Sequence, residues 1–127
     1  MASNFTAYDI PLDTLWTDLD YMINSEIFTI DETRFPLDQM RKLLEEYRWI
    51  PIIDPGIKNV GAFYEEGVKS GALMMEANSD QPFLGKMRAG RTVYPDFFHP
   101  NSSSYWAFLL DSLYQKVPFS GVWLDSN

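Results

Sequence analysis

Acidic side chains follow three short apolar runs in this sequence, and they are the groups best placed to do chemistry. Asp18 and Asp20 come at the end of the first run, Asp54 closes the second and Asp125 the third. Because α/β barrels build their active sites at the carboxyl ends of their strands, an acid placed there is a candidate catalytic residue. A structural interpretation competes with this one, since aspartate also caps strand ends and turns.

The first run is expected to be a strand that starts at Leu12, because Pro11 fits the beginning of a strand but not its middle. If this strand continues to Tyr21, Asp18 and Asp20 point to the same side. Together with Asp13, they place three acids within eight residues. That pattern fits either a solvated strand end or carboxylates lining a polar pocket, and both interpretations remain open.

The remaining elements alternate between helices and strands. Helices are expected from Pro36 to Tyr47, over 62–70 up to Gly71, and after an N-cap at Asn101 or Ser102. Strands are expected over 49–54, over 72–75 and from Val122 to Asp125. The apolar stripes of the first and third helices consist of Met40, Leu43, Leu44 and Tyr47, and of Trp106, Leu109, Leu110 and Leu113.

Residues 77–100 are expected to form a long irregular loop of functional importance, because their aromatic content argues against disorder. Lys86, Arg88 and Arg91 in this loop could bind an anion, but a solvated basic loop is the favoured interpretation. The only histidine, His99, is expected to be a packed or surface residue. With no cysteine and one histidine, the sequence predicts neither a metal site nor a cofactor.

Alternating strands and helices, with acids gathered at one end, indicate an α/β fold, either an open sheet or a (β/α)8 barrel. A full barrel needs about 250 residues. The 127 residues of this chain are therefore expected to form one domain, a partial TIM barrel that supplies roughly the first half.

Composition narrows the class of partner. A net charge of −8 argues against nucleic acid and anionic membrane surfaces. No apolar stretch reaches the length of a membrane span, and the N-terminus does not resemble a signal peptide. Aromatic residues make up 16% of the chain, which suits both a large core and platforms on which sugars stack.

Four stretches in order resemble glycoside hydrolase family 31, the α-glucosidase family, from about residue 8 to 127. The first two are Ile10-Pro-Leu-Asp13 with Trp16-Thr-Asp18-Leu-Asp20-Tyr21-Met22, and Ile50-Pro-Ile-Ile-Asp54-Pro-Gly-Ile57. The others are Tyr94-Pro-Asp96-Phe with Tyr105-Trp106, and Gly121-Val-Trp123-Leu-Asp125-Ser-Asn127.

The resemblance implies a retaining glycosidase without metal or cofactor, acting on an α-glucoside or oligosaccharide. Asp125 would be the nucleophile. Asp18 and Asp54 would bind hydroxyl groups of the terminal glucose, and Ile52 and Trp123 would form the apolar walls of the pocket. Relatives work in several compartments, so the resemblance leaves the localisation open.

The chain also departs from the family pattern. Met87-Arg88-Ala89-Gly90 stands where the family has Trp-Pro-Gly, so Arg88 replaces an aromatic wall, and Ser126 replaces a methionine. The family's acid/base residue comes from the later half of the barrel, so we expect this chain alone to be inactive and to need the missing half for closure. The alternatives are a non-catalytic carbohydrate-binding remnant and an unrelated small α/β domain.

Overall fold

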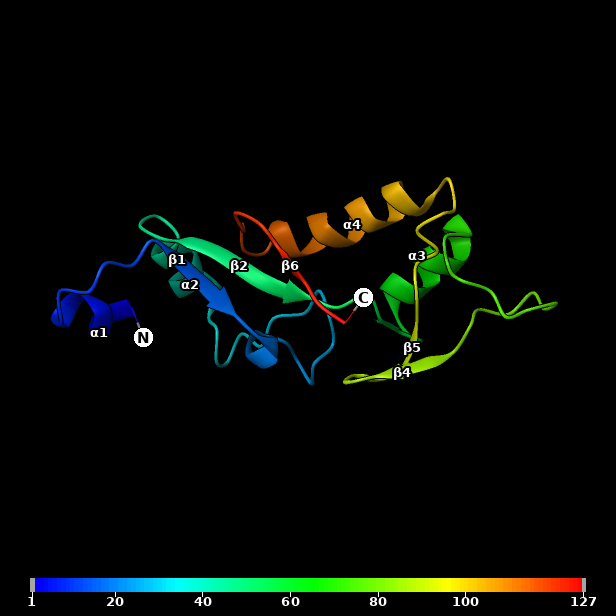
Figure 1. The fold of residues 1–127 in the computed structure, drawn as a ribbon, viewed down its shortest axis with the longest axis horizontal. Helices are drawn as coiled ribbons and strands as arrows, with labels where there is room; N and C mark the ends of the chain where they lie inside the picture. Colours follow the sequence, from blue (N-terminus) through cyan, green and yellow to red (C-terminus); the bar gives the residue numbers. More distant parts are fainter. Residues whose placement is uncertain (1, 127) are drawn as a thin grey trace.

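The computed structural model describes residues 2–126 and contains two small sheets with helices packed on them (Figure 1). In chain order, its elements are α1 (Ala2–Ala7), β1 (Thr14–Thr17), the 3-10 turn η1 (Leu19–Tyr21), α2 (Leu37–Leu43), β2 (Arg48–Ile53), β3 (Ile57–Lys58), α3 (Ala62–Ser70), β4 (Gly85–Met87), β5 (Gly90–Val93), α4 (Ser102–Tyr114) and β6 (Trp123–Leu124).

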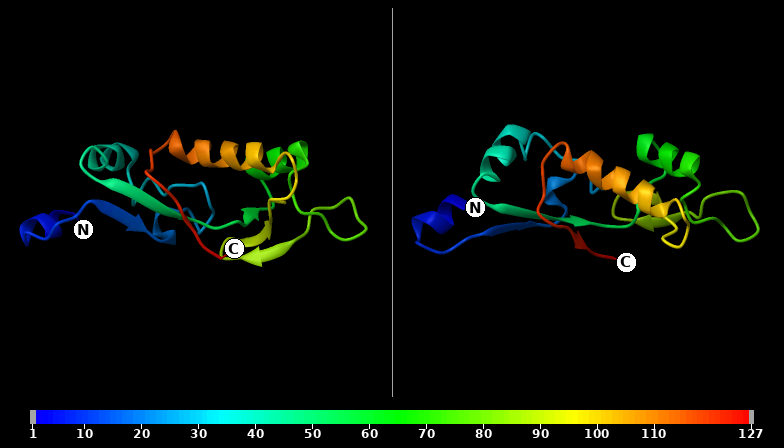
Figure 2. Two further views of the ribbon diagram at one scale, coloured as in Figure 1. Left: turned by 45° about the horizontal axis from the view of Figure 1, so that its top comes forward. Right: turned by 90° about the horizontal axis from the view of Figure 1, so that it is seen from above.

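The first sheet is parallel, with the strand order β1-β2-β6. Helices α2 and α4 lie over one of its faces, and the opposite face is left without a covering helix (Figure 2). This sheet is not closed within residues 2–126. The chain is thus mixed α/β with parallel strands, as the sequence predicted, and an open sheet is consistent with part of a barrel.

The core lies between this sheet and its helices and is rich in aromatic side chains. Trp49 of β2 is buried, meets the Tyr21 ring edge-on at 5.3 Å, and donates its indole N–H to Thr17 at 2.9 Å. In α4, Leu109 and Leu113 are buried as the periodicity predicts, and Tyr105 joins them. None of the helices in the described part of the chain is long and apolar enough to cross a membrane.

The first strand is shorter than predicted, because it ends at Thr17. The Asp18 carboxylate accepts the backbone N–H of Leu19 at 2.7 Å, and Met22 N–H bonds back to the Leu19 carbonyl at 2.9 Å. These bonds favour a tight turn over an extended chain. Asp18 and Asp20 therefore lie at the start of η1 and within it, and the alternation expected of a strand does not apply to them.

Three other predicted elements differ in the structure. Residues 72–75 form no strand and make only isolated bridges, from Leu73 to Pro95 and from Met75 to Pro82. The region 77–100 is not wholly irregular, because β4 and β5 form an antiparallel hairpin that also pairs with β3. Helix α2 ends at Leu43 rather than Tyr47, and a looser turn carries the chain on to β2.

Candidate active site

The parallel sheet brings three of the predicted acids to one end of neighbouring strands. Asp18 follows β1, Asp54 follows β2 and Asp125 follows β6, with β2 in the middle of the sheet. The Asp125 N–H also reaches the Ile53 carbonyl at 3.4 Å, which holds the two strand ends side by side. The three carboxylates therefore converge from separate parts of the sequence.

Asp54 is the buried member of this group. It is only 3% exposed, whereas Asp125 is half-buried and Asp18 is exposed. Burial raises the pKa of the Asp54 carboxyl, the Arg88 guanidinium lowers it, and the charges of Asp125 and Asp18 raise it further, so that the net shift is upward. Asp125 and Asp18 are thus close enough to affect the ionisation of Asp54.

Arg88 contacts this group directly, which corrects the favoured interpretation of the basic loop as merely solvated. Its terminal nitrogen donates to Asp54 Oδ2 at 3.0 Å. The other oxygen, Oδ1, is buried and accepts no hydrogen bond within the described residues. An unsatisfied buried acceptor is costly unless a ligand or a water supplies a donor, so Oδ1 is a candidate contact for a hydroxyl group.

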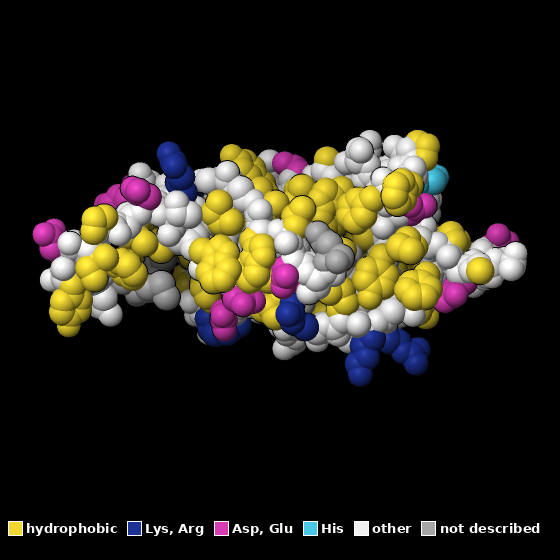
Figure 3. Space-filling view, in the orientation of Figure 1, with side chains coloured by type: hydrophobic (Ala, Val, Ile, Leu, Met, Phe, Trp, Pro, Cys, Tyr) yellow, Lys and Arg dark blue, Asp and Glu magenta, His cyan; other side chains and the backbone are white. Residues whose placement is uncertain are grey.

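Aromatic side chains lie beside the acids on the uncovered face of the sheet. Trp16 and Trp123 stack with their ring centroids 4.4 Å apart, and they come from strands on either side of β2. The strand register pairs Trp123 with Ile52, which places Ile52 on the same face, although its side chain is fully buried. In Figure 3, hydrophobic and acidic side chains are exposed next to one another over this sheet.

Trp16 also belongs to this group, although the sequence did not predict it as a site residue. A signal was available, because Trp16 lies in the apolar run that leads directly to Asp18. The register between β1 and β6 across β2 decides whether it meets Trp123, and this register cannot be read from spacing alone.

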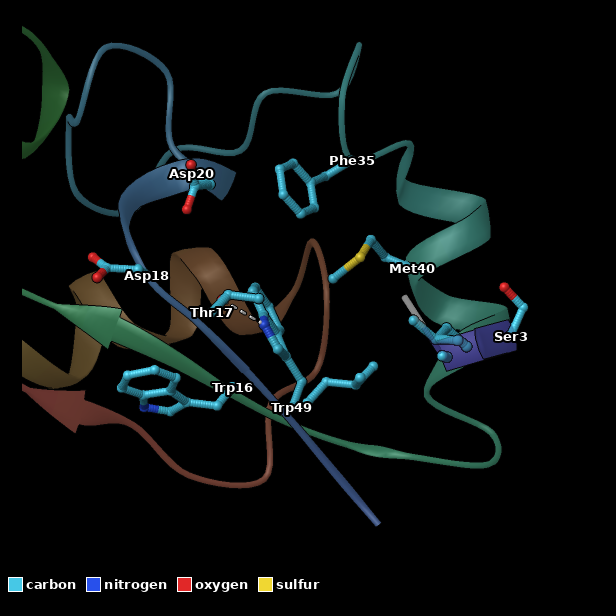
Figure 4. Close-up of a pocket in the computed structure, with 11 residues that line it drawn as sticks. Ser3, Trp16, Thr17, Asp18, Asp20, Phe35, Met40 and Trp49 are labelled. Atoms are coloured by element: carbon cyan, nitrogen blue, oxygen red, sulfur yellow. Dashed lines mark hydrogen bonds between the residues drawn. The ribbon is translucent and has the colours of Figure 1, made fainter. Parts of the chain in front are cut away.

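A cavity of about 760 Å³ lies between β1, α1 and α2 (Figure 4). Its walls are mainly apolar, with Phe35, Met40 and Trp49 facing one another across it. Asp18 and Asp20 reach its rim, but neither Asp54 nor Asp125 lines it. The cavity therefore adjoins the carboxylate group at Asp18 but does not contain Asp54 or Asp125.

Sequence comparison identifies a family. Residues 1–127 match the family described as "Glycosyl hydrolases family 31 TIM-barrel domain". A probable alpha/beta-glucosidase agdC of Neosartorya fischeri is 36% identical over 98% of this chain, and the lysosomal alpha-glucosidase of Mus musculus is 34% identical over all of it. The chain spans only 15% and 14% of the length of these two relatives.

Solved structures agree with this match. A Family 31 alpha-glucosidase from Bacteroides thetaiotaomicron aligns with a TM-score of 0.74 and 28% identity, covering 97% of this chain and 21% of that one. A glucosidase II alpha subunit aligns with a TM-score of 0.80 at 22% identity, covering 96% and 14%, and so supports the fold. This chain belongs to glycoside hydrolase family 31.

Proposed function

We propose that this chain supplies the first active-site half of a retaining α-glucosidase, with Asp125 as the nucleophile. The single observation that carries the proposal is the convergence of Asp18, Asp54 and Asp125, which lie at neighbouring strand ends and influence the ionisation of Asp54. A TIM-barrel enzyme builds its catalytic site at this end of its strands. The names of the relatives, which are glucosidases, support an α-glucoside as the substrate.

In this proposal, the half-buried Asp125 carboxylate attacks the anomeric carbon, and the glycosidic oxygen leaves with a proton from an acid. Retaining glycosidases hold that acid about 5–5.5 Å from the nucleophile and use it afterwards as the base for water. Arg88 donates to one oxygen of Asp54 and lowers the pKa of that carboxyl, which works against a role as the proton donor. Asp54 and Asp18 are better suited to accept hydrogen bonds from sugar hydroxyls.

The acid/base residue is expected from the later half of the barrel, beyond residue 127. The 127-residue chain on its own should therefore show no turnover of an aryl α-glucoside. Two-fold or greater turnover above buffer, surviving repeated purification and abolished by Asp125→Asn, would show that this polypeptide holds both catalytic groups.

The decisive experiment uses the longest protein product that carries this sequence. Asp125→Asn should lower kcat for an aryl α-glucoside by about 10⁴-fold or more, because the whole covalent route depends on this carboxylate. Asp80→Asn, in an exposed loop, is the matched control and should retain full activity. Equal activity of Asp125→Asn and Asp80→Asn would overturn the assignment.

A non-catalytic carbohydrate-binding remnant remains the second candidate. It is favoured by Asp54 Oδ1, which accepts no hydrogen bond from residues 2–126, and by the stacked indoles of Trp16 and Trp123. Such groups can hold a sugar without reacting with it. Calorimetric titration with maltose separates the two functions. Binding without hydrolysis in the longest product would favour the remnant, and hydrolysis would favour the enzyme.

A further inference from the structure

Arg88 lies at the tip of the β4–β5 hairpin, in a two-residue loop between the paired Met87 and Gly90. Gly90 has a φ of 101°, which a side chain would strain, so glycine favours the tight turn here. Because β5 pairs with β3, which follows Asp54 after a short turn, the hairpin lies next to the segment that continues from β2. The strand pairing thus fixes the position of the Arg88 backbone.

The tip is seated directly on the turn that follows Asp54. A Cβ added at Gly56 would collide with the Met87 side chain and approach Thr92 Cβ to 3.3 Å. Gly56 is two residues from Asp54, and Met87 precedes Arg88. This close packing fixes the backbone next to Arg88, and the Arg88 side chain, 48% exposed, reaches Asp54 from there.

The charges around Asp54 are unbalanced without Arg88. Asp125 and Asp18 face it from the ends of β6 and β1, and the phenol of Tyr21, whose own pKa is raised by burial and by Asp54, packs from η1. Arg88 is the cation that contacts Asp54 among the described residues. Because the Asp54 side chain is 4% exposed, water screens the repulsion between these acids poorly.

We propose that Arg88 is a positioning residue of the sugar site: it holds Asp54 as a carboxylate, occupies Oδ2 and leaves Oδ1 as the oxygen that accepts a sugar hydroxyl. The proposal rests on the proposed function, in which Asp54 binds sugar. It gives a role to the residue that stands in place of the tryptophan in the family pattern. An ion pair therefore replaces an aromatic wall at this point of the site.

The first test measures the ionisation of Asp54 directly, without sugar. In protein labelled with ¹³C in its aspartate carboxyls, Arg88→Gln should shift the titration of Asp54 upwards by at least about one pH unit, because a favourable charge is removed. In Arg88→Lys, which keeps the positive charge, Asp54 should titrate close to where it does in the parent protein. Arg91→Gln, on the same hairpin, removes an equal charge and is the control. An unchanged Asp54 titration in Arg88→Gln would overturn the proposal.

The second test measures maltose affinity by calorimetry across pH, with Asp125→Asn in every protein compared so that maltose is not hydrolysed. Arg88→Gln should bind about tenfold more weakly where its Asp54 is protonated, and should recover at higher pH, while Arg88→Lys and Arg91→Gln follow the parent protein. An equal loss at every pH, without rescue by lysine, would indicate a merely structural role and overturn the proposal. Tighter binding by Arg88→Gln would also overturn it, since Arg88 would then obstruct the site.

The two tests separate this proposal from the function beneath it. If the parent protein binds no maltose while Asp54 titrates as expected, sugar binding by Asp54 is wrong, and the proposed function falls together with the sugar-positioning role. If maltose binds but the titration of Asp54 is the same with and without Arg88, the role proposed for Arg88 is wrong and the proposed function is unaffected.

Discussion

Asp54 is the residue at which stability and the proposed function oppose each other. Its pKa is raised above the ordinary value of 3.8, so the folded protein binds a proton at this site more readily than the unfolded chain does. Stability that depends on this proton is present at low pH and is lost as pH rises through the raised pKa. A site built to bind sugar with a buried carboxylate therefore weakens the fold near neutral pH.

Asp54→Asn is expected to remove this dependence. At low pH, the variant and the parent should have similar free energies of unfolding, and as pH rises the parent should become the less stable of the two. Asparagine still offers Arg88 an oxygen acceptor, so the geometry of the contact is largely kept. Urea unfolding from pH 4 to pH 8 measures the difference, and a parent protein that gains stability over the variant as pH rises would contradict the expected direction.

Sequence alone identified the acids at this site but not their cation. Apolar runs that end in Asp18, Asp54 and Asp125 are visible by eye, and the parallel sheet explains why they meet. The contact between Arg88 and Asp54 spans 34 positions and depends on how the hairpin tip packs on Gly56. No local pattern encodes such packing, which is why the basic residues were interpreted as solvated.

Among the elements, η1 is the one that positions Asp18. The Tyr21 hydroxyl donates to the Ile52 carbonyl at 2.7 Å in a buried setting, which ties η1 to the end of β2 beside Asp54. Tyr21→Phe should lower the free energy of unfolding by about 1–2 kcal/mol through loss of this bond. Tyr114→Phe, on an exposed ring, is the control and should change little; equal effects on urea unfolding would show that the tie is unimportant.

The packing of α3 against α4 can be tested in the same way. Helices α3 and α4 approach closely at Gly67, where an added Cβ would lie 2.6 Å from the Tyr105 hydroxyl oxygen and 2.8 Å from a Leu73 methyl. Gly67→Ala should therefore cost about 1–3 kcal/mol through overpacking, measured by urea unfolding. Gly71→Ala is a poor control because its φ is positive, but Ser103→Ala, on the exposed face of α4, is suitable. A Gly67→Ala protein as stable as Ser103→Ala would contradict the close approach.

Element prediction succeeded where one periodicity continues and failed where side chains cap or pair locally. The bounds of α3 match the predicted range, although Val68 is 50% exposed, and in α4 Leu109 and Leu113 of the predicted stripe are buried. The first strand was overextended because Asp18 caps η1, a choice that spacing cannot show. The three- and four-residue strands of the β4–β5 hairpin carry no long alternation that would predict them, although Gly85 opens β4 and Gly90 opens β5.

At the scale of the whole molecule, the sheet has an uncovered face and unpaired edges. Trp16 is 60% exposed and Leu124 is 50% exposed on β1 and β6, which are the edge strands of the described sheet. Bare apolar surface next to an unpaired strand favours association. The isolated 127-residue chain should therefore self-associate, and sedimentation that shows a single monomeric species up to high concentration would contradict this.

Covalent trapping of Asp125 in the longest product that carries this sequence would test its role as the nucleophile most directly. A ring-fluorinated α-glucosyl fluoride needs little help from an acid to leave, so it reports on the nucleophile alone and slows the breakdown of the glycosyl-enzyme. Mass spectrometry should find one fluoroglucosyl group on the peptide with Asp125, and none in Asp125→Asn. A label on another carboxylate, or full turnover with no label, would contradict the assignment.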